Sequence, residues 1–243
     1  MSNNPLQQFE VTTIKAINIA GIDASFTNAS LFMSIIVLGV WAFVSLGMTR
    51  AAMVPGRWQS MVELSYEFIS NMLHDAAGAE ARKFFPFIFS LFMFILFANL
   101  IGMIPGAFTV TSHLAVTFAF AAVVFLMVTL TGLIKNGLGF FKLFVPSGVP
   151  VALLILIVPI EFISYLVRPV SLSVRLFANM VAGHTMLKVM AGFVASLGLY
   201  LGWAPVLFSV ALTGLEVFVA ILQAYVFAML SCIYLNDAFH VDH

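Results

Sequence analysis

Long stretches without charged residues divide the first half of the chain into segments of the length that crosses a bilayer. Residues 31–48 form the apolar centre of the first such interval. Residues 84–134 contain no Asp, Glu, Lys or Arg, but the interval is too long for one crossing of about 20 residues. The Pro105-Gly106 pair interrupts it near the middle. The pattern therefore predicts three transmembrane helices, at 31–48, 86–104 and 114–134.

Residues 57–78 follow a different pattern, because polar and apolar positions both recur there at helical spacing. The polar positions are Ser60, Glu63, Glu67, Asn71 and His74. The apolar positions expected on the opposite face are Met61, Leu64, Phe68, Met72 and Ala76. This pattern predicts an amphipathic helix that lies on the membrane surface or on a partner protein.

The last third of the chain predicts two helices that are longer than a bilayer is thick. Residues 150–192 are largely apolar, and as one helix they would run about 60 Å, whereas the hydrocarbon core is about 30 Å thick. Such a helix either breaks at Pro159 or Pro169 or is steeply inclined. Residues 204–235 form a second long segment, so we expect a tilted pair joined near residues 197–203.

Composition agrees with a membrane protein. Of the 243 residues, 63% are hydrophobic and 8% are charged, compared with roughly 25% charged residues in soluble domains. We therefore predict an all-α, polytopic fold in one membrane domain, 1–243, with about five transmembrane helices, one surface helix and an outer N-terminal arm, 1–27. The formal net charge is zero, which gives no reason to expect a nucleic-acid partner.

Basic residues set the expected orientation of the spans. They gather in two loops, with Arg50, Arg57, Arg82 and Lys83 in the first and Lys135 and Lys142 in the second. These loops are expected on the cytoplasmic or matrix side. Five crossings then place the N-terminus outside and the C-terminus inside.

Polar residues inside the predicted spans point to function, because a charge at mid-bilayer costs at least about 2.5 kcal/mol. Arg175 lies far from both ends of the 150–192 segment. At 100° per residue it shares a broad face with Arg168, Ser171 and Asn179. In the next long segment, Glu216 and Gln223 share a face. Asn99, in the second span, is expected to bond a neighbouring helix, and lining a channel is the alternative.

An antiparallel hairpin of the two long segments creates two polar levels. Residues whose numbers add up to about 399 then lie at equal depth, so Arg175 meets Gln223 and His184 meets Glu216. His184 and Glu216 are able to exchange protons, whereas Arg175 keeps its charge. An arginine between two polar pockets would block direct proton flow. Protons would cross only on a mobile carboxylate from another subunit.

The same residues carry a resemblance to a known family. SLSVRLFANMVAGH (171–184) and TGLEVFVAILQAYVFAMLSCIYL (213–235) closely resemble subunit a of the F-type ATP synthase. The likeness includes FANLIGMIPG (97–106) and IEFISYLVRPVSLS (160–173), and it covers essentially the whole chain after residue 30.

The resemblance implies a role for each matching residue. Arg175 matches the essential arginine of the family, and Asn179 and Gln223 match its neighbouring amides. Glu161 and Ser171 match positions of the inner half-channel. His184 and Glu216 match the outer pair, which favours protons over sodium ions.

The resemblance also implies a non-catalytic stator that binds no cofactor, metal or nucleotide. Its expected partners are the c-subunit ring, b-type peripheral stalk subunits, the rest of the ATP synthase and the lipid bilayer. The expected location is the bacterial inner membrane, with the mitochondrial inner membrane as the alternative. Two other functions compete with this one, a proton-coupled secondary transporter and a scaffold whose polar residues only hold helices together.

Overall fold

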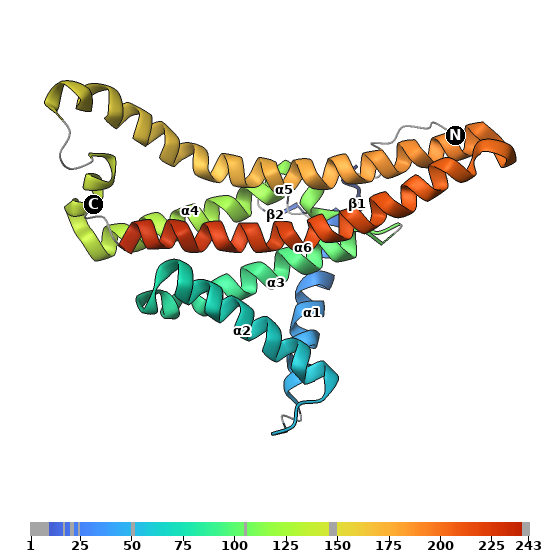
Figure 1. Ribbon diagram of the computed structural model, residues 1–243, viewed down its shortest axis with the longest axis horizontal. Coiled ribbons are helices and arrows are strands. Elements are labelled where there is room, and N and C mark those ends of the chain that lie inside the picture. The colour runs from blue at the N-terminus through green and yellow to red at the C-terminus, as the bar shows by residue number, and fades with distance from the viewer. Residues whose placement is uncertain are drawn as a thin grey trace. The chain divides into compact units, whose positions relative to one another are not determined.

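Helices make up nearly all of the computed structural model of the chain, which describes residues 10–16, 18–19, 22–23, 25–49, 52–104, 106–145 and 150–239 (Figure 1). The six α-helices in this part are α1 (Asn28–Met48), α2 (Arg57–Ala77), α3 (Phe85–Gly102), α4 (Leu114–Asn136), α5 (Val151–Leu201) and α6 (Trp203–Phe239). Short 3₁₀ helices are η2 (Ala79–Phe84), η3 (Val110–Ser112) and η4 (Gly137–Phe144). The predicted all-α fold is confirmed.

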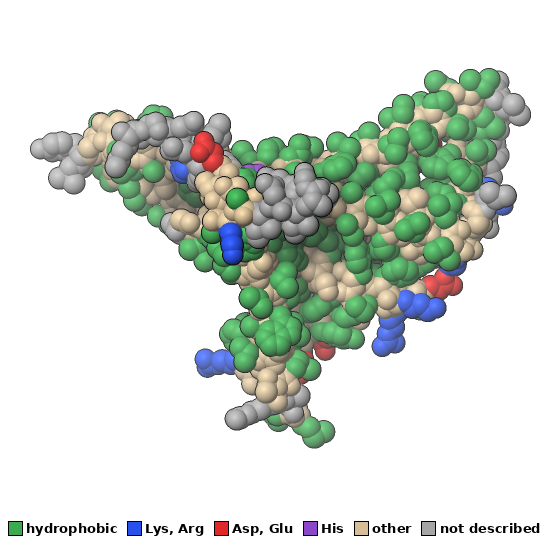
Figure 2. Space-filling view, turned by 180° about the vertical axis from the view of Figure 1, so that it is seen from behind, with side chains coloured by type: hydrophobic (Ala, Val, Ile, Leu, Met, Phe, Trp, Pro, Cys, Tyr) green, Lys and Arg blue, Asp and Glu red, His purple; other side chains and the backbone are tan. Residues whose placement is uncertain are grey.

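Five of the helical segments in the described part of the chain are long and apolar enough to cross a membrane. They are Asn28–Met48, Ala79–Gly102, Leu114–Asn136, Leu153–Gly198 and Trp203–Phe239. Many of their large apolar side chains are exposed, including Trp41, Ile155 and Phe218. On the face seen in Figure 2, hydrophobic side chains cover most of the described surface and charged ones lie in small groups. These findings confirm the predicted polytopic membrane protein.

The described part of the N-terminal arm forms two short antiparallel pairs. Strand β1 (Thr13–Lys15) pairs with β4 (Phe26–Thr27), and β2 (Asn18–Ile19) pairs with β3 (Ile22–Asp23). Helix α1 begins directly after β4, where the Thr27 hydroxyl accepts the Ser30 N–H as an N-cap. Residues 1–9, 17, 20–21 and 24 of the predicted arm lie outside the described residues, as do Arg50 and Pro105.

Two alternatives were open for the first long segment, a break at Pro159 or Pro169 or a steep inclination of an unbroken helix. Pro159 and Pro169 lie inside α5, and the helix continues through both of them, so the break considered at these positions is absent. Proline is tolerated there because it removes one backbone hydrogen bond and leaves the others of the helix in place. A helix longer than the bilayer core therefore favours the alternative, in which α5 is inclined to the membrane.

The helical backbone is interrupted instead at Gly198, inside the range of α5 and close to its end at Leu201. The Gly198 φ of 64° lies in the left-handed region that glycine adopts without steric cost. The carbonyl of Gly198 accepts the N–H of Gly202 at 2.9 Å. A Cβ on Gly202 would lie 2.5 Å from that carbonyl oxygen. Two glycines thus allow the tight turn that reverses the chain.

The chain divides into two compact units, each built from three separate segments. The first unit comprises residues 1–50, 93–114 and 176–224. In it, the rings of Phe43 and Phe97 pack at 5.6 Å, and those of Phe32 and Phe108 at 6.2 Å. These contacts join α1 to the end of α3 and to the loop that follows. The predicted single membrane domain, 1–243, stays a prediction.

The second unit comprises residues 51–92, 115–175 and 225–243. It contains α2, whose buried apolar residues include Val62, Ile69 and Leu73. Met61, Leu64 and Phe68, predicted to share one apolar face with Met72, are exposed, whereas Met72 is buried. Packing within the chain covers the flank of α2 that carries Val62, Ile69 and Leu73, and the predicted contact of the Met61, Leu64 and Phe68 face with lipid or a partner protein stays a prediction.

Candidate functional site

His184 on α5 and Glu216 on α6 form a buried pair inside the first unit. The Nε2 atom of His184 lies 3.7 Å from Oε1 of Glu216, and the two side chains are 12% and 6% exposed. The portions of α5 and α6 that carry them run side by side and antiparallel (Figure 1). The structure thus brings together the two groups that the hairpin register placed at one depth.

A close approach of the two helices makes this pairing possible. A Cβ on Gly183 would lie 2.6 Å from Oε1 of Glu216, which is too close for any larger side chain unless the carboxylate moves. Gly183 therefore leaves the space that the Glu216 carboxylate occupies next to His184. Each helix supplies one part of the site. Helix α5 contributes the small residue Gly183, and α6 contributes the acid Glu216.

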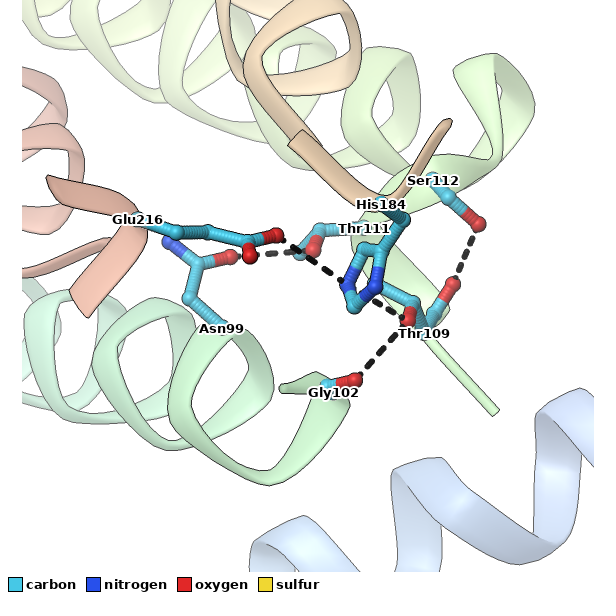
Figure 3. A network of polar contacts seen from close by, with 7 residues as sticks. All are labelled: Asn99, Gly102, Thr109, Thr111, Ser112, His184 and Glu216. Atoms are coloured by element: carbon cyan, nitrogen blue, oxygen red, sulfur yellow. Dashed lines mark hydrogen bonds and ion pairs between the residues drawn. The ribbon is translucent and has the colours of Figure 1, made fainter. Parts of the chain in front are cut away.

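The loop between α3 and α4 contacts His184 from a second direction, as Figure 3 shows. The hydroxyl of Thr109 lies 3.2 Å from Nε2 of His184 and donates to the carbonyl of Gly102 at 3.1 Å. Thr109 is buried, and its own carbonyl accepts the Ser112 hydroxyl at 2.6 Å. The sequence analysis missed this residue. The hydroxyl-rich run Thr109, Thr111, Ser112 between two apolar spans was the available signal.

Asn99 ties this loop to α6. Its side-chain N–H donates to the carbonyl of Ala220 at 3.2 Å, and its Oδ1 accepts the Thr111 hydroxyl at 2.9 Å. Asn99 and Thr111 are fully buried. Of the two interpretations of Asn99, the bond to a neighbouring helix is the one seen, and it also holds the loop that carries Thr109.

His113 ends the same loop just before α4. Its ring stacks on Phe108 with 4.9 Å between centroids. Burial lowers the pKa of His113 below its ordinary value of 6.5, because a charged ring loses solvation there. The neutral ring is therefore the form that suits the folded loop.

Asn179 and Gln223 are joined further along the same helix pair. Nδ2 of Asn179 donates to Oε1 of Gln223 at 2.9 Å, and Gln223 is 1% exposed. Gln223 is thus bonded to the amide one helical turn beyond Arg175 in the sequence. The expected facing of Arg175 and Gln223 stays a prediction.

Arg175 and Ser171 are both exposed on α5, in the second unit. Residues four apart lie on one helix face, so the two share a side that the chain itself does not cover. Glu161 lies on the same helix and is partly buried. The second unit therefore holds Arg175 together with Glu161 and Ser171, the two residues predicted for the inner half-channel. The roles of all three stay predictions.

Arg168 behaves differently from Arg175, although both are arginines of the same helix. Its guanidinium donates to Oδ2 of Asp237 on α6 at 2.8 Å and lies over the ring of Tyr234, 4.9 Å from its centroid. The hydroxyls of Tyr165 and Thr129 bond beside it at 2.6 Å. Sequence reasoning missed Asp237, which lies near the end of α6, where a single carboxylate carries no periodic signal.

With this geometry in view, comparison with known proteins decides the family. Residues 30–236 match the family described as ATP synthase A chain. The chain belongs to the ATP synthase subunit a family. It is 60% identical to ATP synthase subunit a of Pelagibacter ubique, and the alignment covers 100% of both chains. It is 61% identical to that of Parvibaculum lavamentivorans, covering 99% of this chain and 95% of the relative.

A third relative, ATP synthase subunit a of Allorhizobium ampelinum, is 58% identical, with 99% of this chain and 98% of the relative covered. Membership of the subunit a family confirms the resemblance identified from the sequence. It makes this chain a proton-translocating, multi-pass membrane component of the F-type ATP synthase, and it decides against the secondary transporter. Proton transport and ATP synthesis by the whole complex are therefore the functions in which this chain takes part.

Proposed function

We propose that this chain provides two offset half-channels that load and unload protons on carboxylates of a rotating c-subunit ring. The outer half-channel contains His184 and Glu216, and the inner one contains Glu161 and Ser171. Arg175 separates them, with Asn179 and Gln223 as neighbouring amides. The chain itself performs no ATP chemistry, which occurs on other subunits.

The observation that carries the proposal is the contrast between two arginines of α5. Arg168 is paired with Asp237, whereas Arg175 is exposed and takes part in none of the ion pairs found among the described residues. An unpaired guanidinium inside a membrane segment is costly. A carboxylate from outside the chain would remove that cost, and this is the role assigned to the ring.

The fixed charge of Arg175 explains how flow is directed. A protonated ring carboxylate is neutral and moves into lipid, whereas an ionised one is attracted to the guanidinium. A proton cannot pass the arginine, which does not deprotonate. Each proton that crosses 100 mV releases roughly 2.3 kcal/mol. This free energy drives rotation only if protons cannot pass directly from one half-channel to the other.

The remaining surfaces suit partners of the same complex. The exposed apolar flank of α2 and the exposed faces of the spans fit lipid, the c-ring and b-type stalk subunits. The relatives named above come from bacteria, so the proposed location is the bacterial inner membrane.

The test is the Arg175→Ala variant in inverted vesicles that contain the whole ATP synthase. We expect ATP-driven proton pumping to be lost while the complex assembles and ATP hydrolysis persists. Arg57→Ala, which removes a guanidinium from the start of α2, is the matched control and keeps pumping. Coupled pumping by the Arg175→Ala complex would refute the proposal.

A further inference from the structure

We infer that Thr109 is a positioning residue that holds His184 with its proton on Nε2, the nitrogen nearest Glu216. This inference rests on the proposed function, since it concerns how the outer pair passes protons. It adds a residue from the α3–α4 loop to a site otherwise built from α5 and α6.

The first step is the direction of the bonds around the Thr109 hydroxyl. A hydroxyl has one hydrogen to donate, and a carbonyl oxygen only accepts. Because Thr109 bonds the carbonyl of Gly102 at 3.1 Å, its hydrogen is committed to that bond. The second contact of the hydroxyl, at 3.2 Å to Nε2 of His184, therefore requires that Nε2 carries the hydrogen.

The second step is that Thr109 has little freedom to turn away. Its Cγ2 lies 2.8 Å from the position that a Cβ on Gly102 would take, so the end of α3 fits closely against it. Bonds from Ser112 to the Thr109 carbonyl and from Thr111 to Asn99 hold the flanking loop. These residues are buried, and Figure 3 shows the bonds between them. Buried polar groups need such partners, so the bonds oppose any turning of the loop.

The third step is the position of Nε2 between two oxygens. It lies 3.2 Å from the Thr109 hydroxyl and 3.7 Å from Oε1 of Glu216. In the neutral ring, the Nε2–H donates to the Thr109 hydroxyl. It lies beside the Glu216 carboxylate, which accepts the proton in the transfer. A proton taken up at Nδ1 makes the ring an imidazolium. The Nε2 proton then passes to the Glu216 carboxylate, which becomes a neutral carboxyl, and the ring is left neutral with the proton on Nδ1.

The inference is tested in the whole ATP synthase with ¹⁵N-labelled histidine, by solid-state NMR, which distinguishes Nε2–H from Nδ1–H rings. The His184 signal is assigned by its loss in a His184→Gln complex. We expect the wild-type ring to be the Nε2–H tautomer at neutral pH. A wild-type ring with its proton on Nδ1 would overturn the inference without any variant.

Thr109→Val keeps the shape of the side chain and removes the hydroxyl. We expect the preference for Nε2–H and the rate of proton pumping each to fall roughly two- to tenfold, the factor for one lost hydrogen bond. Thr109→Ser, which retains the hydroxyl, is expected to keep both the Nε2–H preference and the rate of proton pumping. Thr131→Val, which removes a hydroxyl bonded to a carbonyl of its own helix, is the control. If the valine variant does not assemble, Thr109→Ala replaces it.

The outcomes separate this inference from the proposed function. If Glu216→Ala abolishes pumping and Thr109→Val leaves the tautomer and the pumping rate unchanged, the proposed function stands and the role of Thr109 is wrong. If Glu216→Ala pumps normally, the proposed outer half-channel itself is wrong.

Discussion

Gly183 and Glu216 are in closer contact than any other side chain at position 183 would allow, since a Cβ there would lie 2.6 Å from the carboxylate. The contact places the acid beside His184, which is the next residue of α5. The close contact of His184 with Glu216 therefore depends on one small residue, Gly183.

We predict that Gly183→Ala lowers ATP-driven proton pumping at least about fivefold, because overpacking of this kind typically costs 1–3 kcal/mol and displaces Glu216 from His184. Pumping is measured in inverted vesicles with equal amounts of assembled complex. Gly192→Ala is the matched control, since a Cβ on Gly192 meets no atom within 4 Å. Normal pumping by Gly183→Ala would show that proton pumping does not require the Glu216 carboxylate to lie in the space beside Gly183.

Exchanging His184 and Glu216 between their two positions is expected to preserve part of the proton pumping. In the double variant His184→Glu with Glu216→His, both groups remain at one level, because the two side chains face each other at 3.7 Å. We predict that this variant pumps protons faster than Glu216→Ala alone. Equal rates for the exchange and the truncation would mean that the two groups do not act as one relay.

The bond between Asn99 and Thr111 gives a prediction about stability. Asn99→Leu leaves the buried Thr111 hydroxyl without its acceptor and the Ala220 carbonyl without this donor, and an unsatisfied buried group costs about 1–3 kcal/mol. We expect the complex to dissociate at a lower temperature in detergent. Adding Thr111→Val removes one of the unsatisfied groups, so the double variant should recover part of the loss. A further fall in that temperature would contradict the assigned bond.

The pKa of His113 predicts how the α3–α4 loop responds to pH. Burial lowers this pKa in the folded state from 6.5, so the folded loop favours the neutral ring. The resulting stability is fully present above about pH 6.5 and is lost as the pH falls through the lowered value. We expect amides of residues 107–113 to exchange faster at pH 5 than at pH 7.5, after correction for intrinsic rates.

His113→Gln is the control for that measurement, since glutamine does not titrate in this range. Its loop should show the same corrected exchange at both pH values. An equally strong pH dependence in His113→Gln would place the titrating group elsewhere.

The spans and the helix pair were predictable because the membrane imposes simple rules on sequence. Charge-free intervals gave three crossings and two long, largely apolar segments gave two more, and the described part of the structure has five segments able to cross a membrane. The pairing of His184 with Glu216 was also accessible, because an antiparallel hairpin with a tight turn has only one register once the turn is placed. The continuation of α5 through Pro159 and Pro169 was not, since the same proline breaks some helices and is accommodated in others.

The sequence by itself determined the class of protein, the helices and the ionisable residues inside them, because hydrophobicity and helical period are local properties. Only the tertiary structure decided that Thr109 contacts His184, that Asn99 bonds the Ala220 carbonyl and that Asp237 pairs with Arg168. These contacts join residues that lie far apart in the chain, and nothing in the local pattern records which backbone carbonyl or side chain a buried polar group will meet. Burial requires that each such group finds a partner, but the packing of the helices chooses which one.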